Sequence, residues 1–299
     1  MRAINLTIIV ALLITKLGAD YSGYTSLQIV PSARECAMAT VGVASALGPQ
    51  AMYYNSALSS TLSDFAINVN YANLFLDTDI QSLFLVRPFG GFNLGFGIVN
   101  YNAGKLEYRP NFPTDEPYGT FTPSDFNFFF NFSTQSLSQK PLTGIGVSAR
   151  WYYQKISEYS ANGIGVDAGF TVNVLNNLKL GLAINNFGTA MKFQRRSFSL
   201  PTKLAGGISY QVRFQRVTIE NAFDVNYLIN DRKVNFNDGI EFGFDQRYFL
   251  RAGYRASDNL NDYNVGFGLL VKNIRIEYAL SPNKLDLASN HHFSISFGY

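Results

Sequence analysis

The stretch FNFFFNF, Phe126 to Phe132, places a phenylalanine at every second position, with Asn127 and Asn131 between them. Gly144 to Tyr153, GIGVSARWYY, alternates in the same way. A period of two is typical of a β-strand with one apolar face. Similar stretches follow one another from residue 64 to the C-terminus, so we expect a chain built of strands.

Composition indicates what the apolar faces contact. Charged residues make up 15% of the 299 residues and aromatic residues another 15%, whereas soluble domains carry about 25% charged residues. The second face of the strands holds Gly, Ser, Asn and isolated charges, and not the many Lys and Glu of a soluble β-sandwich. No later apolar run is as long as a transmembrane helix, so strands must present the apolar surface to lipid. We expect an all-β fold, a transmembrane antiparallel barrel of about 14 strands in the bacterial outer membrane.

The connections support a barrel. Tight links such as Asp245-Gln246 alternate with long ones, for which we expect 103–120, 155–162, 187–201, 228–237 and 281–289. Short periplasmic turns alternating with long external loops are typical of bacterial barrels. The expected strands lie near 64–72, 79–87, 92–102, 121–132, 143–154, 163–174, 178–186, 202–212, 215–226, 238–244, 247–255, 262–271, 273–280 and 290–299.

The chain begins with a targeting pattern. Arg2 precedes the apolar run Ile4 to Ile14, and the small residue Ala19 offers a cleavage point, so we expect residues 1–19 to be a secretory signal peptide. A retained membrane anchor is the alternative, but the apolar run is too short to span a bilayer. Residues 20–62 are then an N-terminal segment and residues 63–299 the barrel.

The stretch Pro31 to Ala57, PSARECAMATVGVASALGPQAMYYNSA, lacks strand alternation. It is rich in small residues and predicts two short helices, Ser32 to Thr40 and Pro49 to Leu58, the second begun by its proline. Isolated helices of this length are unstable in water. We therefore expect this segment to be a plug that fills or gates the barrel lumen, next to inward-facing glycines. A scaffold required for barrel assembly is the alternative.

Charged residues concentrate on the inward face of the later strands. Unpaired charges in a narrow interior are costly, so we expect these residues to pair with one another and with Arg34 and Glu35 of the plug. Bracing of the barrel is the simplest interpretation, and the lining of a transport path is the alternative. The cluster comprises Arg150, Glu220, Asp224, Glu241, Arg251, Arg255, Arg275 and Glu277.

The last strand carries a terminal aromatic side chain. Phe293, Ile295, Phe297 and Tyr299 form one apolar face, which resembles the signal by which the barrel-assembly machinery recognises outer-membrane barrels. This strand must pair with the first one, because an open sheet edge cannot face hydrocarbon.

Several kinds of site are not expected. The formal net charge of +3 without a Lys/Arg cluster indicates no nucleic-acid partner. His291 and His292 point to opposite faces of a strand, so we expect no metal site, no cofactor and no catalytic group. Ser294 beside His292 leaves a barrel-wall enzyme as a remote alternative. Asn221 falls on the lipid-facing side, which no pattern in the sequence explains.

One motif in the plug resembles a known family. Its residues resemble the conserved N-terminal motif of the PorV/PorQ outer-membrane proteins, which are related to the FadL-type channels, although Ala39, Gly48 and Ser56 depart from the usual pattern. The segment Tyr118 to Phe126 also resembles that family. The matching positions are Ser32, Ala33, Arg34, Met38, Gly42, Val43, Pro49, Ala51, Asn55 and Ala57.

The resemblance implies a non-enzymatic barrel with one of two roles. In the secretion branch such proteins serve type IX secretion or surface attachment, with secretion-machine proteins and secreted cargo as partners. In the FadL-type branch they pass small hydrophobic molecules, and a purely structural barrel is a third possibility. At 299 residues the chain has little external sequence for gathering ligands, which favours the secretion role.

The external loops would then bind the partners. Loops 103–120 and 187–201 carry aromatic side chains of the kind enriched at protein contacts, although a belt at the membrane interface would use the same residues. These aromatics are Tyr108, Phe112, Tyr118, Phe193 and Phe198.

Overall fold

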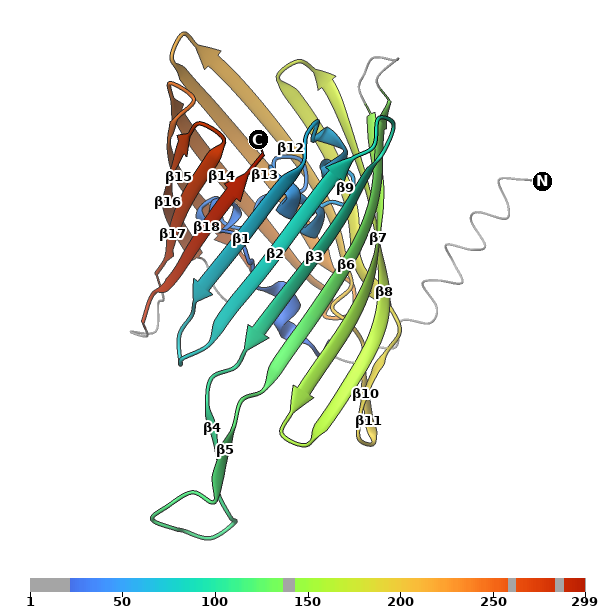
Figure 1. The fold of residues 1–299 in the computed structure, drawn as a ribbon, viewed down its shortest axis with the longest axis vertical. Coiled ribbons are helices and arrows are strands. Elements are labelled where there is room, and N and C mark those ends of the chain that lie inside the picture. Colours follow the sequence, from blue (N-terminus) through green and yellow to red (C-terminus); the bar gives the residue numbers. More distant parts are fainter. Residues whose placement is uncertain (1–21, 137–142, 258–261, 283–287, 299) are drawn as a thin grey trace, which may run out of the picture.

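The protein is a closed, antiparallel β-barrel of fourteen strands with its N-terminal segment inside (Figure 1). A computed structural model describes residues 22–136, 143–257, 262–282 and 288–298, so the expected signal peptide and Tyr299 lie outside the described residues. The last strand closes the barrel on the first, with Val69 opposite Ile295. The predicted fold class is confirmed.

Each expected strand is present. The barrel strands are β1 (Ala66–Asn73), β2 (Asp79–Pro88), β3 (Asn93–Asn102), β6 (Ser124–Ser136), β7 (Thr143–Ile156), β8 (Tyr159–Leu175), β9 (Leu178–Gly188), β12 (Lys203–Phe214), β13 (Val217–Leu228), β14 (Lys233–Phe244), β15 (Tyr248–Ala256), β16 (Asp262–Val271), β17 (Ile274–Ser281) and β18 (Asn290–Phe297).

Two of the expected long loops are wrong. β7 and β8 meet at the two-residue turn Ser157-Glu158, and only residues 229–232 join β13 to β14. Ser157 has a φ of 57° and Arg232 a φ of 54°. Both turns therefore use left-handed backbone without the Gly or Asn that marks such positions in a sequence.

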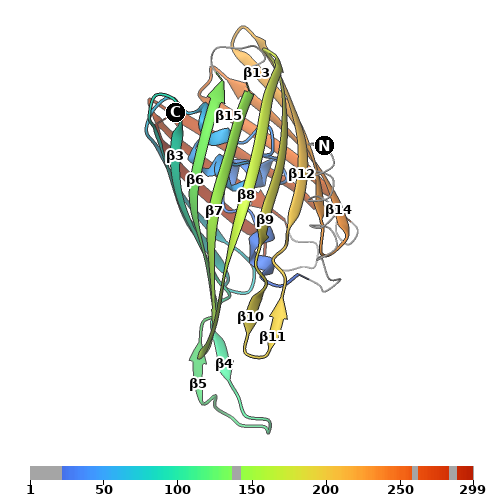
Figure 2. The ribbon, with the colours of Figure 1, turned by 90° about the vertical axis from the view of Figure 1, so that its right-hand side faces the viewer.

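The two ends of the barrel differ. The links 103–123 and 189–202 contain two small hairpins, β4 (Leu106–Tyr108) with β5 (Gly119–Phe121) and β10 (Met191–Phe193) with β11 (Arg196–Phe198). Both hairpins project from the same end, whereas the C-terminus lies at the opposite end (Figures 1 and 2). We assign the hairpin end to the cell surface and the opposite end to the periplasm, because bacterial barrels have long external loops and short periplasmic turns.

The outer wall is apolar. Side chains such as Phe130, Leu182 and Leu250 are 60% exposed or more, as lipid-facing residues must be. Asn221 is an exception on this wall, where its Nδ2 donates to Asp238 Oδ1 at 3.0 Å and to the Gly239 carbonyl at 3.2 Å. The two polar side chains on this part of the wall therefore satisfy one another.

The N-terminal segment runs through the lumen as short helical turns, η1 (Thr25–Gln28), α2 (Ala33–Ala37), η2 (Pro49–Tyr53) and η3 (Leu58–Thr61). They are shorter than the two predicted helices. Ala39 and Thr40 have φ values of 53° and 70°, which end the first helix early. Within the described residues, no helix is long and apolar enough to cross a bilayer.

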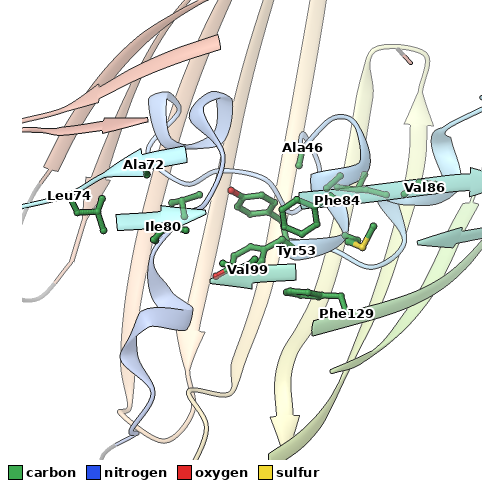
Figure 3. Packing of buried hydrophobic residues seen from close by; sticks show 14 residues of the cluster. Ala46, Tyr53, Ala72, Leu74, Ile80, Phe84, Val86, Val99 and Phe129 are labelled. Atoms are coloured by element: carbon green, nitrogen blue, oxygen red, sulfur yellow. The ribbon is translucent and has the colours of Figure 1, made fainter. Parts of the chain in front are cut away.

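The plug has an apolar side that packs on the wall. Tyr53 lies against Phe84 of β2 and Phe129 of β6, with ring centroids 6.4 and 5.7 Å apart (Figure 3). Ala46, Met52 and further residues complete the cluster. Because all these side chains are buried, the helical turns gain from the wall the stability that they lack alone.

Candidate functional site in the plugged lumen

Arg34 of the plug joins two strands of the wall. Its side chain is fully buried, and Nε and Nη2 donate to Glu241 of β14 and Glu220 of β13, each at 3.0 Å. Nη1 donates to the Ser45 carbonyl at 3.0 Å and approaches Glu35 at 3.4 Å. A buried guanidinium is tolerated only with such partners, so Arg34 ties the plug to the barrel.

The network continues along the wall. Arg251 of β15 donates to Glu241 and, at 2.9 Å, to Glu277 of β17, and Arg275 lies 3.8 Å from Glu277. The structure therefore brings five of the predicted lumen charges together around Arg34. These five residues are Glu220, Glu241, Arg251, Arg275 and Glu277.

The other three predicted charges lie elsewhere. Arg150 pairs with Asp167 and stacks on Phe129, its Cζ 4.1 Å from the ring centroid. Asp224 binds plug backbone, and Arg255 pairs with Asp262 in a half-buried position. Asp167 was missed, although it alternates with Gly165 and Gly169 on the inward face of its strand.

Side-chain amides and carboxylates of the wall and plug hold the backbone of the plug. Asp224 Oδ2 accepts from the backbone N of Gly42 at 2.7 Å and of Val43 at 3.0 Å. Asn55 donates to the Val43 carbonyl at 2.8 Å and to the Phe170 carbonyl of β8 at 3.2 Å. These bonds satisfy backbone N–H and C=O groups of the plug that have no partner within a regular helix.

Wall asparagines repeat this arrangement around the barrel. Each donates its Nδ2 to one turn of the plug, and sequence reasoning gave them no role, although their inward parity was visible. The contacts are Asn93 to the Ser59 carbonyl at 2.7 Å, Asn131 to the Ser56 carbonyl at 3.0 Å, Asn237 to Thr40 Oγ1 at 2.7 Å and Asn264 to the Cys36 carbonyl at 2.8 Å.

The other motif residues line the path of the plug. Ser32 and Ala33 begin α2, and the Ala33 backbone N donates to Ser294 of β18 at 2.8 Å. Gly42 lies under Tyr54, where an added Cβ would come within 2.7 Å of the ring. The remaining members are all buried, namely Met38, Val43, Pro49, Ala51 and Ala57.

Glycines let the wall approach the plug backbone. A Cβ at Gly146 would lie 2.1 Å from the Ser56 oxygen, one at Gly181 2.3 Å from the Val43 oxygen, and one at Gly253 2.4 Å from the Ala39 nitrogen. Gly169, Gly207 and Gly239 also approach plug backbone, and Gly266 approaches the side chain of Ala37. The inward glycines therefore accept the plug at contact distance, and the space that they were expected to leave is filled.

One cavity lies on each side of the plug. A small one of about 90 Å³ faces the cell-surface end and is lined by Leu27, Val30, Tyr53 and Tyr54, with Lys203 and Arg255. A larger polar one of about 430 Å³ opens at the periplasmic end beside Ser45, Glu220 and Glu241.

A chain of polar contacts joins the two cavities through the plug. Tyr54 OH lies 2.8 Å from Ser32 Oγ, which donates to Glu35 Oε2 at 2.6 Å. Glu35 in turn contacts Arg34. Burial raises the pKa of the Glu35 carboxyl above its ordinary value, and it raises the pKa of the neighbouring Cys36 thiol to about 12.

The second external loop packs back onto the plug. Phe193 and Phe198 join a buried cluster with Tyr24, Leu27 and Tyr152 at the cell-surface end. These two side chains are only partly buried, and their predicted role in partner contact stays a prediction. Tyr108, Phe112 and Tyr118 on the first loop are exposed.

Two further predicted features can be placed. Phe293, Ile295 and Phe297 point outward from β18 and are about half exposed. His292 is buried on the opposite face, and Ser294 Oγ donates to Asn70 Oδ1 at 2.5 Å. Among the described residues, no group of three His, Cys, Asp or Glu side chains could hold a metal ion.

The fold and lumen define the class of the protein, a plugged β-barrel of the outer-membrane type. No protein-family model matches the sequence, and no curated protein matches it. Among solved structures, the toluene transporter TodX of Pseudomonas putida is similar with a TM-score of 0.62 and 13% identity, over 94% of this chain and 99% of TodX.

Two more solved structures resemble the chain. The monoaromatic hydrocarbon channel CymD has a TM-score of 0.60 and 13% identity, over 90% of this chain and 97% of CymD. A FadL homologue of Pseudomonas aeruginosa has a TM-score of 0.57 and 12% identity, over 90% and 99% of the two chains. The fold is therefore that of FadL-like outer-membrane barrels. Together with the apolar outer wall, it places the chain in the bacterial outer membrane. The PorV/PorQ assignment stays a prediction.

Proposed function

We propose that the chain is a non-enzymatic outer-membrane channel for small apolar molecules, closed in this structure by its plug. The observation that carries the proposal is the arrangement of the lumen, in which the plug separates one cavity at each end of a closed barrel. The names of its structural neighbours, a toluene transporter and a monoaromatic hydrocarbon channel, support this class of substrate. These observations support the channel role better than the secretion role that the sequence favoured.

Uptake of a radiolabelled monoaromatic hydrocarbon by cells tests the proposal. A strain that lacks such channels would carry this barrel in its outer membrane, and a matched strain would carry an unrelated barrel of the same abundance. Faster uptake with this barrel is expected. Equal uptake by the two strains would refute the channel role.

One observation favours protein contact as a second function. The β4–β5 hairpin extends beyond the barrel (Figure 2) and exposes Tyr118 at 72% and Phe112 at 61%. Exposed aromatics are enriched at protein interfaces. Affinity capture of the barrel from its native membrane, with the hairpin intact or with Phe112→Ser and Tyr118→Ser, tests this function. Recovery of secretion components only with the intact hairpin would support it, and recovery of none would refute it.

A further inference from the structure

The outer wall contains an apolar groove near the periplasmic end of β14, β15 and β16. Its volume is about 540 Å³, and its lining includes Phe242, Phe244, Tyr248, Leu250, Phe267 and Leu269. Phe242 is 45% exposed and Leu250 66% exposed. Because these side chains face lipid, the groove offers an apolar channel for a hydrocarbon chain rather than for water.

Basic turns border this groove. The turns that join β12 to β13, β14 to β15 and β16 to β17 carry Arg216, Arg247 and Lys272, all exposed. Asp245 is the acid of these turns and pairs with Arg216. Three cations and one acid leave a surplus of two positive charges at this rim.

Two contacts tie the cations to the groove. The Arg216 Cζ lies 5.0 Å from the ring centroid of Phe244, which lines the groove. The Arg247 backbone N donates to the Phe244 carbonyl at 3.0 Å, and its carbonyl accepts from Leu270 of β16 at 2.7 Å. Arg216 and Arg247 therefore stand at the periplasmic end of the apolar groove, and Lys272 lies in the neighbouring turn that follows β16.

A second hollow on the wall lacks this combination. It has a volume of about 620 Å³ and lies on β8, β9, β12 and β13, where Leu182, Leu204 and Tyr227 line it. The hollow lies toward the cell-surface ends of β12 and β13, where Leu204 pairs with Tyr227, and is therefore away from the basic periplasmic turns. This hollow supplies a matched control for apolar surface without cations.

We propose that the groove on β14–β16 and its basic turns bind one anionic phospholipid of the periplasmic leaflet. An acyl chain lies in the groove, and the phosphate lies against Arg247 and Lys272. The site thus places positive charge beside apolar surface, as a phospholipid places its anionic headgroup beside its acyl chains. The site is separate from the lumen, so it does not depend on the transport proposal.

Native mass spectrometry of the detergent-purified barrel tests the site, with phosphatidylglycerol and phosphatidylcholine of the same acyl chains as probes. We expect one phosphatidylglycerol to be retained in preference to phosphatidylcholine. Arg247→Gln with Lys272→Gln should weaken its retention roughly 30-fold, at about fivefold per cation. Lys155→Gln with Arg232→Gln, the same charge change at the opposite end, should leave retention unchanged.

Two further arms separate the parts of the site. Leu250→Trp should fill the groove and lower retention, whereas Leu182→Trp in the control hollow should not. Inorganic phosphate should not displace the lipid, because the acyl chain contributes to binding. Equal retention of the two lipids, no effect of the turn variants, or full displacement by phosphate would each overturn the proposal. Heat-dependent gel migration verifies that every variant is folded.

Discussion

Replacing Arg34 by Met should release the plug. The side chain is buried between Glu220 and Glu241, and removal of one partner from a buried ion pair costs about 3–5 kcal/mol. Because only the docked state contains these contacts, the undocked population should rise about 100-fold to a few thousand-fold.

Cys36 reports this opening. It is the one cysteine of the sequence, it is 3% exposed, and burial raises its pKa to about 12, so a docked plug protects it from maleimide. Where the plug docks and undocks faster than maleimide reacts, labelling follows the undocked population, so the labelling rate of Arg34→Met should increase by the same factor. Arg109→Met breaks an exposed pair with Glu107 and should change the rate by a few-fold at most.

A third variant isolates the electrostatic cause. Adding Glu220→Gln to Arg34→Met removes the carboxylate that is left without a cation and should return part of the protection, whereas Glu241 keeps its bond to Arg251. Labelling of Arg34→Met within a few-fold of the wild-type rate, in a folded barrel, would refute the reasoning. A barrel that fails to assemble would show that the plug is a scaffold.

Two further predictions concern the wall. Gly146→Val should raise the rate of Cys36 labelling, because a Cβ there would lie 2.1 Å from the Ser56 oxygen and overpacking costs about 1–3 kcal/mol. Gly91→Ala has open space around it and should leave the rate unchanged. Equal labelling rates in the two variants would contradict the close fit between wall and plug. Asn221→Leu with Asp238→Leu should stabilise the barrel in bilayers by about 1 kcal/mol, because polar groups on the lipid face are costly. Urea titration measures this change, and a loss of stability would show that the pair braces the wall.

The sequence predicts the barrel well because a strand that faces lipid must alternate. FNFFFNF therefore fixes both the position of β6 and the inward direction of Asn127 and Asn131. The same parity places Glu220 and Glu241 in the lumen, and an arginine in a small-residue plug needs such partners. The alternation along a strand predicts which side chains point into the lumen, and to that extent the site was predictable.

The path of the plug could not be derived in this way. Which inward residues meet it depends on contacts between segments up to 261 positions apart in the chain, as between Ala33 and Ser294. Asn264 and Asp167 therefore had no visible role, and the packing of Phe193 against the Tyr24 cluster could not be foreseen. The turn at Ser157 was missed because its left-handed backbone uses a residue that does not mark it.

The central claim is that the plug closes a channel, and a reversible lock tests it most directly. Cys36 and Ala279 of β17 belong to the same buried cluster, so Ala279→Cys is the wall position chosen to form a disulfide with the plug. In cells that carry this variant, we predict that oxidation stops uptake of the radiolabelled hydrocarbon and that reduction restores it, while wild-type uptake is unaffected by either treatment. Undiminished uptake with the disulfide formed would contradict the account.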